Sequence, residues 1–164
     1  EGLGKALAFL DKVLELSPNQ NNVIATRADL YFRSGMHREA IREYQRAYEA
    51  SGRSRQYLLG ASASLAVTGQ MTEALRIIEE SAKDPVAAEQ VPYYRARLHA
   101  ALGHREDALK ALQAGLDTRC DCLGSLLRGT GFDFLRSDPA FHEILRRAGF
   151  PPDAIERQAA QKRP

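Results

Sequence analysis

Residues able to do chemistry are few in this 164-residue chain, and its two cysteines are the first to consider. Cys120 and Cys122 are separated by a single residue, and a disulfide between cysteines so close in sequence is strained. A structural zinc site needs more cysteines or histidines at defined spacing, and none follows them. We therefore expect reduced thiols, which are typical of a cytoplasmic protein.

The four histidines give no catalytic pattern either. His37 and His104 closely follow turn glycines, so we expect them to be solvent-exposed turn residues. His99 lies at an apolar helix position, which favours a packed imidazole, and His142 beside Glu143 is expected to form a surface pair. No glycine-rich phosphate loop follows a strand pattern, and no nucleophile, base and orienting residue can be grouped. We expect no catalytic residue, no metal site and no cofactor.

The elements that carry these residues repeat with a period of 34 residues. A turn glycine begins each period, an alanine follows it five positions later, and an acidic residue precedes that alanine. The glycines are Gly35, Gly69 and Gly103, and the alanines are Ala40, Ala74 and Ala108. Such a period is typical of a stacked array of helix pairs, in which each pair buries its apolar face against its neighbour.

Apolar spacing predicts the helices of this array, and proline or glycine predicts their ends. The expected helices are 3–16, 21–34, 37–50, 55–68, 71–83, one that begins near Pro92 and ends before Gly103, and 105–116. Ala28 and Ala40 are expected where paired helices cross closely, because a larger side chain would push them apart. Leu75 is predicted to face inward beside Ala74.

The repeated unit resembles the tetratricopeptide repeat (TPR) family over residues 1–117. A partial repeat spans 1–20, and full repeats span 21–54, 55–88 and 89–117. The resemblance implies an all-α, right-handed helical solenoid of antiparallel helix pairs; an unrelated helical bundle is the alternative. The chain departs from the family pattern where a leucine is favoured, at Arg27, Ala61 and Arg95, and where a tryptophan is favoured, at Ile24, Leu58 and Pro92.

The segment 118–164 breaks the period, and we interpret it as a C-terminal helical cap and tail, because the last repeat of a solenoid exposes an apolar face. A short helix is predicted over 120–127 and another over 153–161. Between them, Asp138 is the predicted N-cap of a helix that begins at Pro139 and ends at Gly149. The sequence from Phe132 to Phe141 is similar to the endings of TPR regions in bacterial multidomain regulators.

Composition argues against several classes of partner. The formal net charge of +2 is spread without a basic stripe, which disfavours nucleic-acid binding. No apolar run approaches the length of about 18 residues that a membrane-spanning helix needs. The helical pattern is already present at the first residues, so we expect this sequence to be a fragment of a longer protein.

In a TPR solenoid the first helix of each pair lines the concave groove, so partner-binding residues are sought there. The predicted set is Asn22, Asp29, Arg33, Gln56, Leu59, Gln90, Tyr93 and Arg97. Amide side chains in series can pair with an extended peptide backbone. The carboxylate clamp of chaperone-type TPRs is rejected, because Ala25, Leu59 and Tyr93 stand at its lysine-type positions.

We therefore expect a non-enzymatic module that binds a protein or peptide, as a region of a larger bacterial regulatory or signalling protein. The alternative function is structural: the repeats would form a homo-oligomer or pack on other domains of the same protein. An enzyme is the third alternative. A binding module should present a free groove, whereas an assembly module should self-associate in solution.

Overall fold

The computed structural model describes residues 2–118, 120, 123–124, 126 and 131–160. These residues form two compact units, 1–88 and 89–164, which are described separately. The helices are α1 (Gly2–Leu16), α2 (Asn21–Arg33), α3 (His37–Ala50), α4 (Arg55–Val67), α5 (Met71–Ser81), α6 (Val91–Ala101), α7 (Arg105–Asp117), α8 (Pro139–Arg147) and α9 (Pro152–Ala160). Short 3₁₀ turns lie at Ala88–Gln90 and Asp133–Leu135. The described chain is all-α and contains no strand, as predicted.

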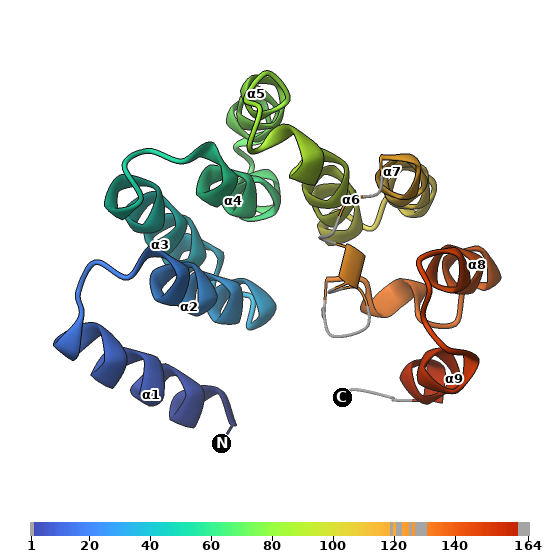
Figure 1. Cartoon of the computed structure of the whole chain (residues 1–164), viewed down its shortest axis with the longest axis horizontal. Helices are drawn as coiled ribbons and strands as arrows, with labels where there is room; N and C mark the ends of the chain where they lie inside the picture. The colour runs from blue at the N-terminus through green and yellow to red at the C-terminus, as the bar shows by residue number, and fades with distance from the viewer. Residues whose placement is uncertain (1, 119, 121–122, 125, 127–130, 161–164) are drawn as a thin grey trace. The chain divides into compact units, whose positions relative to one another are not determined.

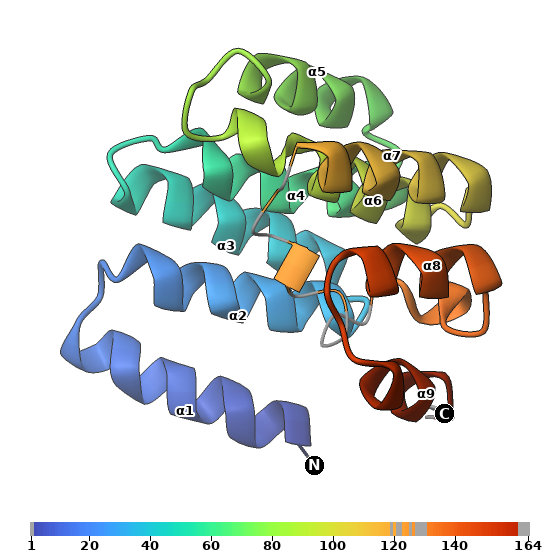
Figure 2. The ribbon, with the colours of Figure 1, turned by 45° about the vertical axis from the view of Figure 1, so that its right-hand side comes forward.

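The first unit contains α1 to α5, and consecutive helices pack against each other (Figure 1). α1 lies alongside α2, which is clear when the molecule is turned (Figure 2). The turn after each first helix uses glycine in the left-handed region, with φ of +72° at Gly35 and +85° at Gly69. Glycine reaches this region without steric cost, so the chain reverses within three residues and the next helix can pack on the previous one.

Small residues occupy the crossing points of the paired helices. Ala28 and Ala40 are fully buried in the α2–α3 pair, and Ser62 and Ala74 are fully buried in the α4–α5 pair. A methyl or hydroxymethyl group lets two helix axes approach closely, whereas a longer side chain would hold them apart. The predicted crossing positions are therefore confirmed as buried.

α4 is buried around most of its circumference, from Leu59 to Ala66. Gly60 contributes to this packing, because the ring of Tyr44 lies where a side chain would begin: a Cβ there would be 2.2 Å from Cε1 of Tyr44. The Tyr44 hydroxyl donates a hydrogen bond to the carboxylate of Asp29 in α2. One aromatic ring thus joins α2, α3 and α4.

Arg27 on α2 connects the helices on either side of it. Its Nε and Nη2 donate to the Glu43 carboxylate at 3.0 and 2.7 Å, and its Nη1 donates to Asp11 at 2.5 Å. A half-buried guanidinium needs such partners, because desolvation opposes its charge. Arg27 is therefore satisfied by carboxylates from α1 and α3.

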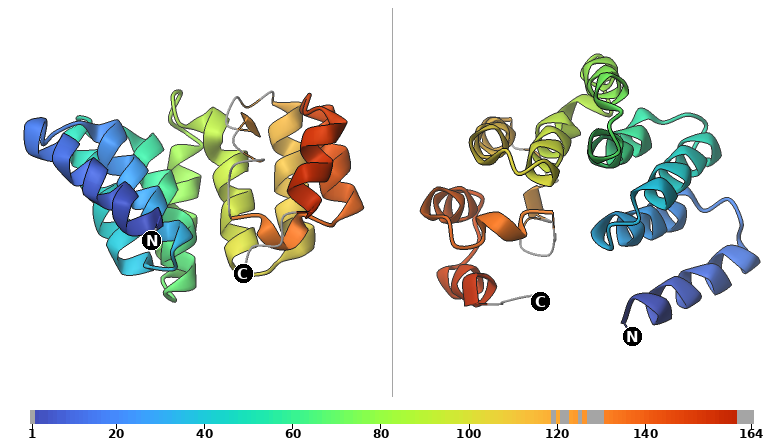
Figure 3. Two further views of the ribbon diagram at one scale, coloured as in Figure 1. Left: turned by 90° about the horizontal axis from the view of Figure 1, so that it is seen from below. Right: turned by 180° about the vertical axis from the view of Figure 1, so that it is seen from behind.

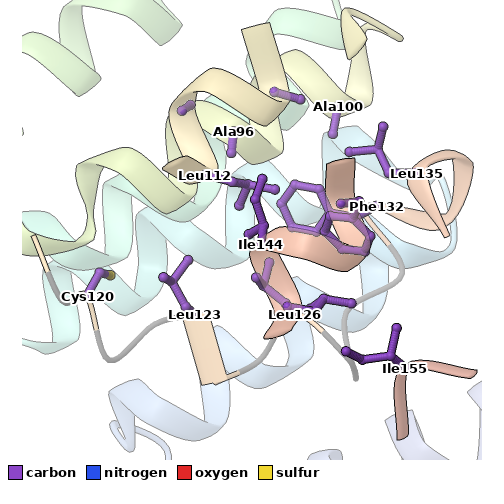
Figure 4. Packing of buried hydrophobic residues seen from close by; sticks show 14 residues of the cluster. Ala96, Ala100, Leu112, Cys120, Leu123, Leu126, Phe132, Leu135, Ile144 and Ile155 are labelled. Atoms are coloured by element: carbon purple, nitrogen blue, oxygen red, sulfur yellow. The ribbon is translucent and has the colours of Figure 1, made fainter. Parts of the chain in front are cut away.

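The second unit contains α6 to α9, with α8 beside α7 and α9 beside α8 (Figure 3). The segment after α7 contributes much of its hydrophobic core: Leu123, Leu126, Phe132, Leu135, Phe141, Ile144, Leu145 and Ile155 pack with Ala96, Ala108 and Leu112. Figure 4 shows Leu112, Ile144 and Phe132 gathered in this core. The apolar face of the α6–α7 pair is thus covered by the segment predicted to cap it.

α8 begins as predicted. Asp138 stands at its N-cap, and its carboxylate accepts a hydrogen bond of 2.9 Å from the amide of Ala140, while Pro139 occupies the first turn. Gly149 follows the helix with φ of +87°. A carboxylate at this position satisfies an amide that has no partner within the helix, so the sequence signal for the start of α8 was physically specific.

Some sequence expectations are corrected by the structure. Leu75 was predicted to face inward but is 44% exposed, and Ile77 and Ile78 fill the core of α5 instead. The reason is rotation about the helix axis, since α5 buries the face that carries Ala74 and Ser81. Half of the predicted helix 120–127 lies outside the described residues. In the part of the chain that the structure describes, no helix is long and apolar enough to span a membrane.

Candidate functional site

The predicted partner-binding residues differ widely in their accessibility. Asn22 and Arg33 are exposed on α2. Half-buried positions are taken by Asp29, Gln56, Gln90 and Tyr93. Leu59 is fully buried and Arg97 is only 5% exposed. The structure therefore does not present the eight residues as one accessible surface.

The half-buried Tyr93 and the buried Arg97 make internal contacts. The Tyr93 ring meets Tyr94 and Phe132 edge-on, with centroids 5.2 and 5.9 Å apart, and joins the core of the second unit. The guanidinium of Arg97 lies over the Tyr94 ring, 5.9 Å from its centroid. These side chains stabilise α6, so substitutions there would alter folding together with any binding. In the first unit, Asn22 and Arg33 are exposed and Gln56 is half-buried.

A hollow of about 530 Å³ opens on the first unit between α3, α4 and α5. Its lining residues are Ile41, Gln45, Tyr48, Arg55, Leu58, Ala61, Leu65, Gln70, Glu73, Arg76, Ile77 and Glu80. None of the eight predicted residues is among them. The hollow combines apolar and amide-bearing side chains with a charged group of residues, which is the composition of many ligand-binding clefts.

The charged group in this hollow is internally paired. Arg76 binds Glu73 and Glu80, each at 2.6 Å, and Arg55 binds Glu80 at 2.7 Å. Hydrogen bonds from Arg76 lower the pKa of Glu73, and hydrogen bonds from Arg55 and Arg76 lower the pKa of Glu80. Both carboxylates therefore stay ionised at neutral pH and neutralise the arginines, so the hollow has no strong net charge to attract an ionic ligand.

A smaller hollow of about 270 Å³ lies on the second unit between α6 and α7. Its lining residues are Val91, Pro92, Arg95, His99, Asp107, Lys110, Ala111 and Ala114. His99 is half-buried at the end of α6, and burial lowers the pKa of its imidazole. His104 is close to it, with ring centroids 6.0 Å apart. This grouping of two imidazoles and a carboxylate was not predicted from the sequence.

Sequence reasoning treated His99 and His104 separately, as a packed residue and a turn residue. His99 is half-buried and His104 is exposed, as expected. The sequence signal that could have predicted their proximity is their position on the two sides of Gly103. A left-handed glycine folds α7 back onto α6, so residues just before and just after the turn become neighbours.

The remaining histidines are less exposed than predicted. His37 is half-buried because the start of α3 packs on α4: its Nδ1 lies 3.3 Å from the Ser64 hydroxyl, and its ring meets Phe32 edge-on. Burial lowers the pKa of His37. His142 is also half-buried, and its Nε2 is hydrogen-bonded to the carbonyl oxygen of Arg136 rather than forming a surface pair with Glu143.

The expectation of a reduced thiol is wrong for Cys120, which is disulfide-bonded and buried. Cys122 lies outside the described residues. Strain opposes a disulfide between cysteines close in sequence without forbidding it. The thiol argument for a cytoplasmic location therefore no longer applies.

Comparison with known proteins gives no relative for this chain: no family model matches it, and neither curated proteins nor solved structures give a match.

Proposed function

We propose that this chain is a TPR-like repeat scaffold, a right-handed solenoid of antiparallel helix pairs that binds a protein or peptide. The observation that carries the proposal is the recurrence of the helix crossing at a fixed interval. Ala40, Ala74 and Ala108 are 34 residues apart, and each is fully buried where a return helix packs on its partner. Repeats of this kind serve mainly as binding surfaces, since their stacked first helices form an extended face.

The surface we assign to the partner is the face of α2 and α4 that carries Asn22, Arg33 and Gln56. An amide side chain donates and accepts hydrogen bonds, so it can pair with the backbone of an extended peptide. Arginine supplies a planar set of donors for a carboxylate or a carbonyl group. The similarity of the Phe132–Phe141 sequence to the endings of TPR regions in bacterial regulators supports a role within a larger regulatory protein.

The experiment is selection of peptides from a displayed random library on the immobilised chain, followed by calorimetry with the best peptide. We expect the Asn22→Ala, Arg33→Ala double variant to weaken binding by about 10-fold, because arginine is prominent among the residues that dominate interface energy. Arg42→Ala is the matched control, since this exposed arginine lies on the return helix α3. It should leave affinity unchanged.

A second double variant, Gln45→Ala with Gln70→Ala, tests the 530 Å³ hollow as a rival site. Loss of affinity in this variant, with the Asn22 and Arg33 variant unaffected, would move the site to the hollow and overturn the assigned face. Failure to recover any peptide that prefers this chain over an unrelated helical protein would contradict the binding function itself.

One observation favours the structural alternative. Phe9 and Leu16 on α1 are 66% and 87% exposed, and large apolar side chains so open to solvent are often covered by a partner surface. If self-association is the function, the mass in solution should rise with concentration, and Phe9→Ser with Leu16→Ser should restore the monomer. A monomeric wild-type chain at micromolar concentration would exclude the homo-oligomer.

A further inference from the structure

His99, His104 and Asp107 converge at the turn between α6 and α7. Each offers one donor atom, an imidazole nitrogen or a carboxylate oxygen, and these three atoms all lie within 4.8 Å of one another. His99 is in the last turn of α6, His104 is the N-cap residue of α7, and Asp107 is in the first turn of α7. The cluster therefore sits within one helix pair of the second unit.

The backbone of the turn fixes this arrangement. Gly103 has φ of +74°, and the amide of His104 donates a hydrogen bond of 2.9 Å to the carbonyl oxygen of His99. The two imidazoles are consequently held by a closed turn rather than by a long flexible loop. A preorganised backbone reduces the entropy lost when side chains converge on a ligand.

A second observation points to a ligand. Nδ1 of His99 is buried from solvent and has no hydrogen-bond partner among the described residues. The nearest charged oxygen, Oδ2 of Asp107, is 3.9 Å away, which is too far for a hydrogen bond. A buried nitrogen without a partner loses its hydration without compensation, so a ligand between His99 and Asp107 would relieve that cost.

We propose that His99, His104 and Asp107 bind a divalent transition-metal ion, with zinc as the best match to the ligand types. Zinc takes imidazole nitrogen at about 2.0–2.1 Å and carboxylate oxygen at about 2.0–2.2 Å. In a tetrahedral site such bonds place donor atoms roughly 3.4 Å apart. The observed donors therefore need to close by up to about 1.4 Å, which rotation of the exposed His104 and Asp107 side chains can supply.

Three protein ligands leave one coordination position open, and the 270 Å³ hollow adjoins it, since His99 and Asp107 line that hollow. Arg95 and Lys110 line it as well. Their positive charge opposes a bare cation but favours an anionic fourth ligand, so the open position suits hydroxide or a carboxylate. The hollow would then select ligands that bring a negative charge to the metal.

The test is titration of the chelator-treated 164-residue chain with Co²⁺, which reports tetrahedral nitrogen and oxygen ligation by its visible absorption. We expect one Co²⁺ per chain and its displacement by Zn²⁺. His104→Ala and Asp107→Asn should each weaken Co²⁺ binding by about 10-fold or more. Loss of a residue that merely hydrogen-bonds to a metal ligand already costs about this much, so loss of a ligand itself should cost at least as much. Both side chains are exposed, so the helix content measured by circular dichroism should be unchanged.

His37→Gln is the control, because His37 belongs to the first unit and lies outside the cluster. It should bind Co²⁺ with wild-type affinity. Absence of Co²⁺ binding by the wild-type chain would overturn the proposal, and so would wild-type affinity in either the His104 or the Asp107 variant.

Discussion

Arg105 at the start of α7 and Asp138 at the N-cap of α8 are joined by two hydrogen bonds, 2.5 Å from Nε and 3.0 Å from Nη2. The same carboxylate accepts a hydrogen bond from the backbone amide of Ala140. The Asp138 side chain therefore both caps the start of α8 and connects this helix to α7. The α8 helix is therefore attached to the last helix pair by a directional contact as well as by apolar packing.

This contact predicts that Asp138→Asn lowers the free energy of unfolding more at neutral pH than in acid. The hydrogen-bonded guanidinium of Arg105 holds the pKa of Asp138 below its ordinary value of 3.8, so the charged form stabilises the fold above that pH and the contribution is lost as pH falls further. Asp138→Asn keeps a capping oxygen but removes the charge. Its deficit in unfolding free energy at pH 7, measured with urea, should shrink as the pH falls below 3.8.

Asp138→Ala removes the cap together with the charge. We expect it to cost about 1 kcal/mol more than Asp138→Asn, and this additional loss should persist at low pH because a cap depends mainly on the acceptor atom. Equal stability of the two variants at pH 7 would mean that the hydrogen bond to Ala140 contributes little.

Gly60 and Gly4 should respond in opposite ways to alanine, although both lie inside helices. A Cβ at Gly60 would come within 2.2 Å of the buried Tyr44 ring, so Gly60→Ala should destabilise by roughly 1–3 kcal/mol through overpacking. Nothing lies within 4 Å of a Cβ at Gly4, so Gly4→Ala should stabilise by about 0.5 kcal/mol. Thermal unfolding of the two variants measures the contrast.

The close crossing of α2 and α3 predicts a contrast on a single helix. Ala40→Leu should lower the free energy of unfolding by about 1–3 kcal/mol, because Ala40 is fully buried between the helices. Arg42→Leu should be nearly neutral, since the Arg42 side chain is 73% exposed. Similar losses in both variants would show that α3 packs through another face.

The burial of His37 predicts that the free energy of unfolding depends on pH near neutrality. Burial lowers its pKa in the folded protein from the ordinary value of 6.5, so the unfolded chain takes up the proton more readily. The corresponding stability is present above pH 6.5 and decreases as pH falls below it. Comparing urea unfolding at pH 7.5 and 5.5, His37→Gln should show a smaller decrease than the wild-type chain.

The helix bounds could be predicted well because their signals are local. The predicted helices 21–34, 37–50 and 55–68 end within one residue of α2, α3 and α4. Glycine at Gly35 and Gly69 stops a helix through its own backbone preference, independently of what packs against it. The period of 34 residues then placed the crossing alanines without any tertiary information.

The accessibility of the candidate site could not be predicted in the same way. Leu59 was placed in an open groove by its helix position, but α4 is covered around most of its circumference. Burial depends on several helices at once, and no local pattern in α4 distinguishes its faces, since Ala, Ser and Leu follow one another from Ala61 to Leu65. The cluster of His99 with Asp107 was missed for a related reason, because it forms between two helices.

Arg27 restricts which helices can flank α2. A leucine at this position could pack against any neighbouring apolar helix, whereas Arg27 requires Asp11 on one side and Glu43 on the other. Removing one partner would leave the half-buried guanidinium with a single carboxylate. α2 is therefore matched to α1 and α3 in particular, because an exchange of either neighbour would take a carboxylate away from the guanidinium.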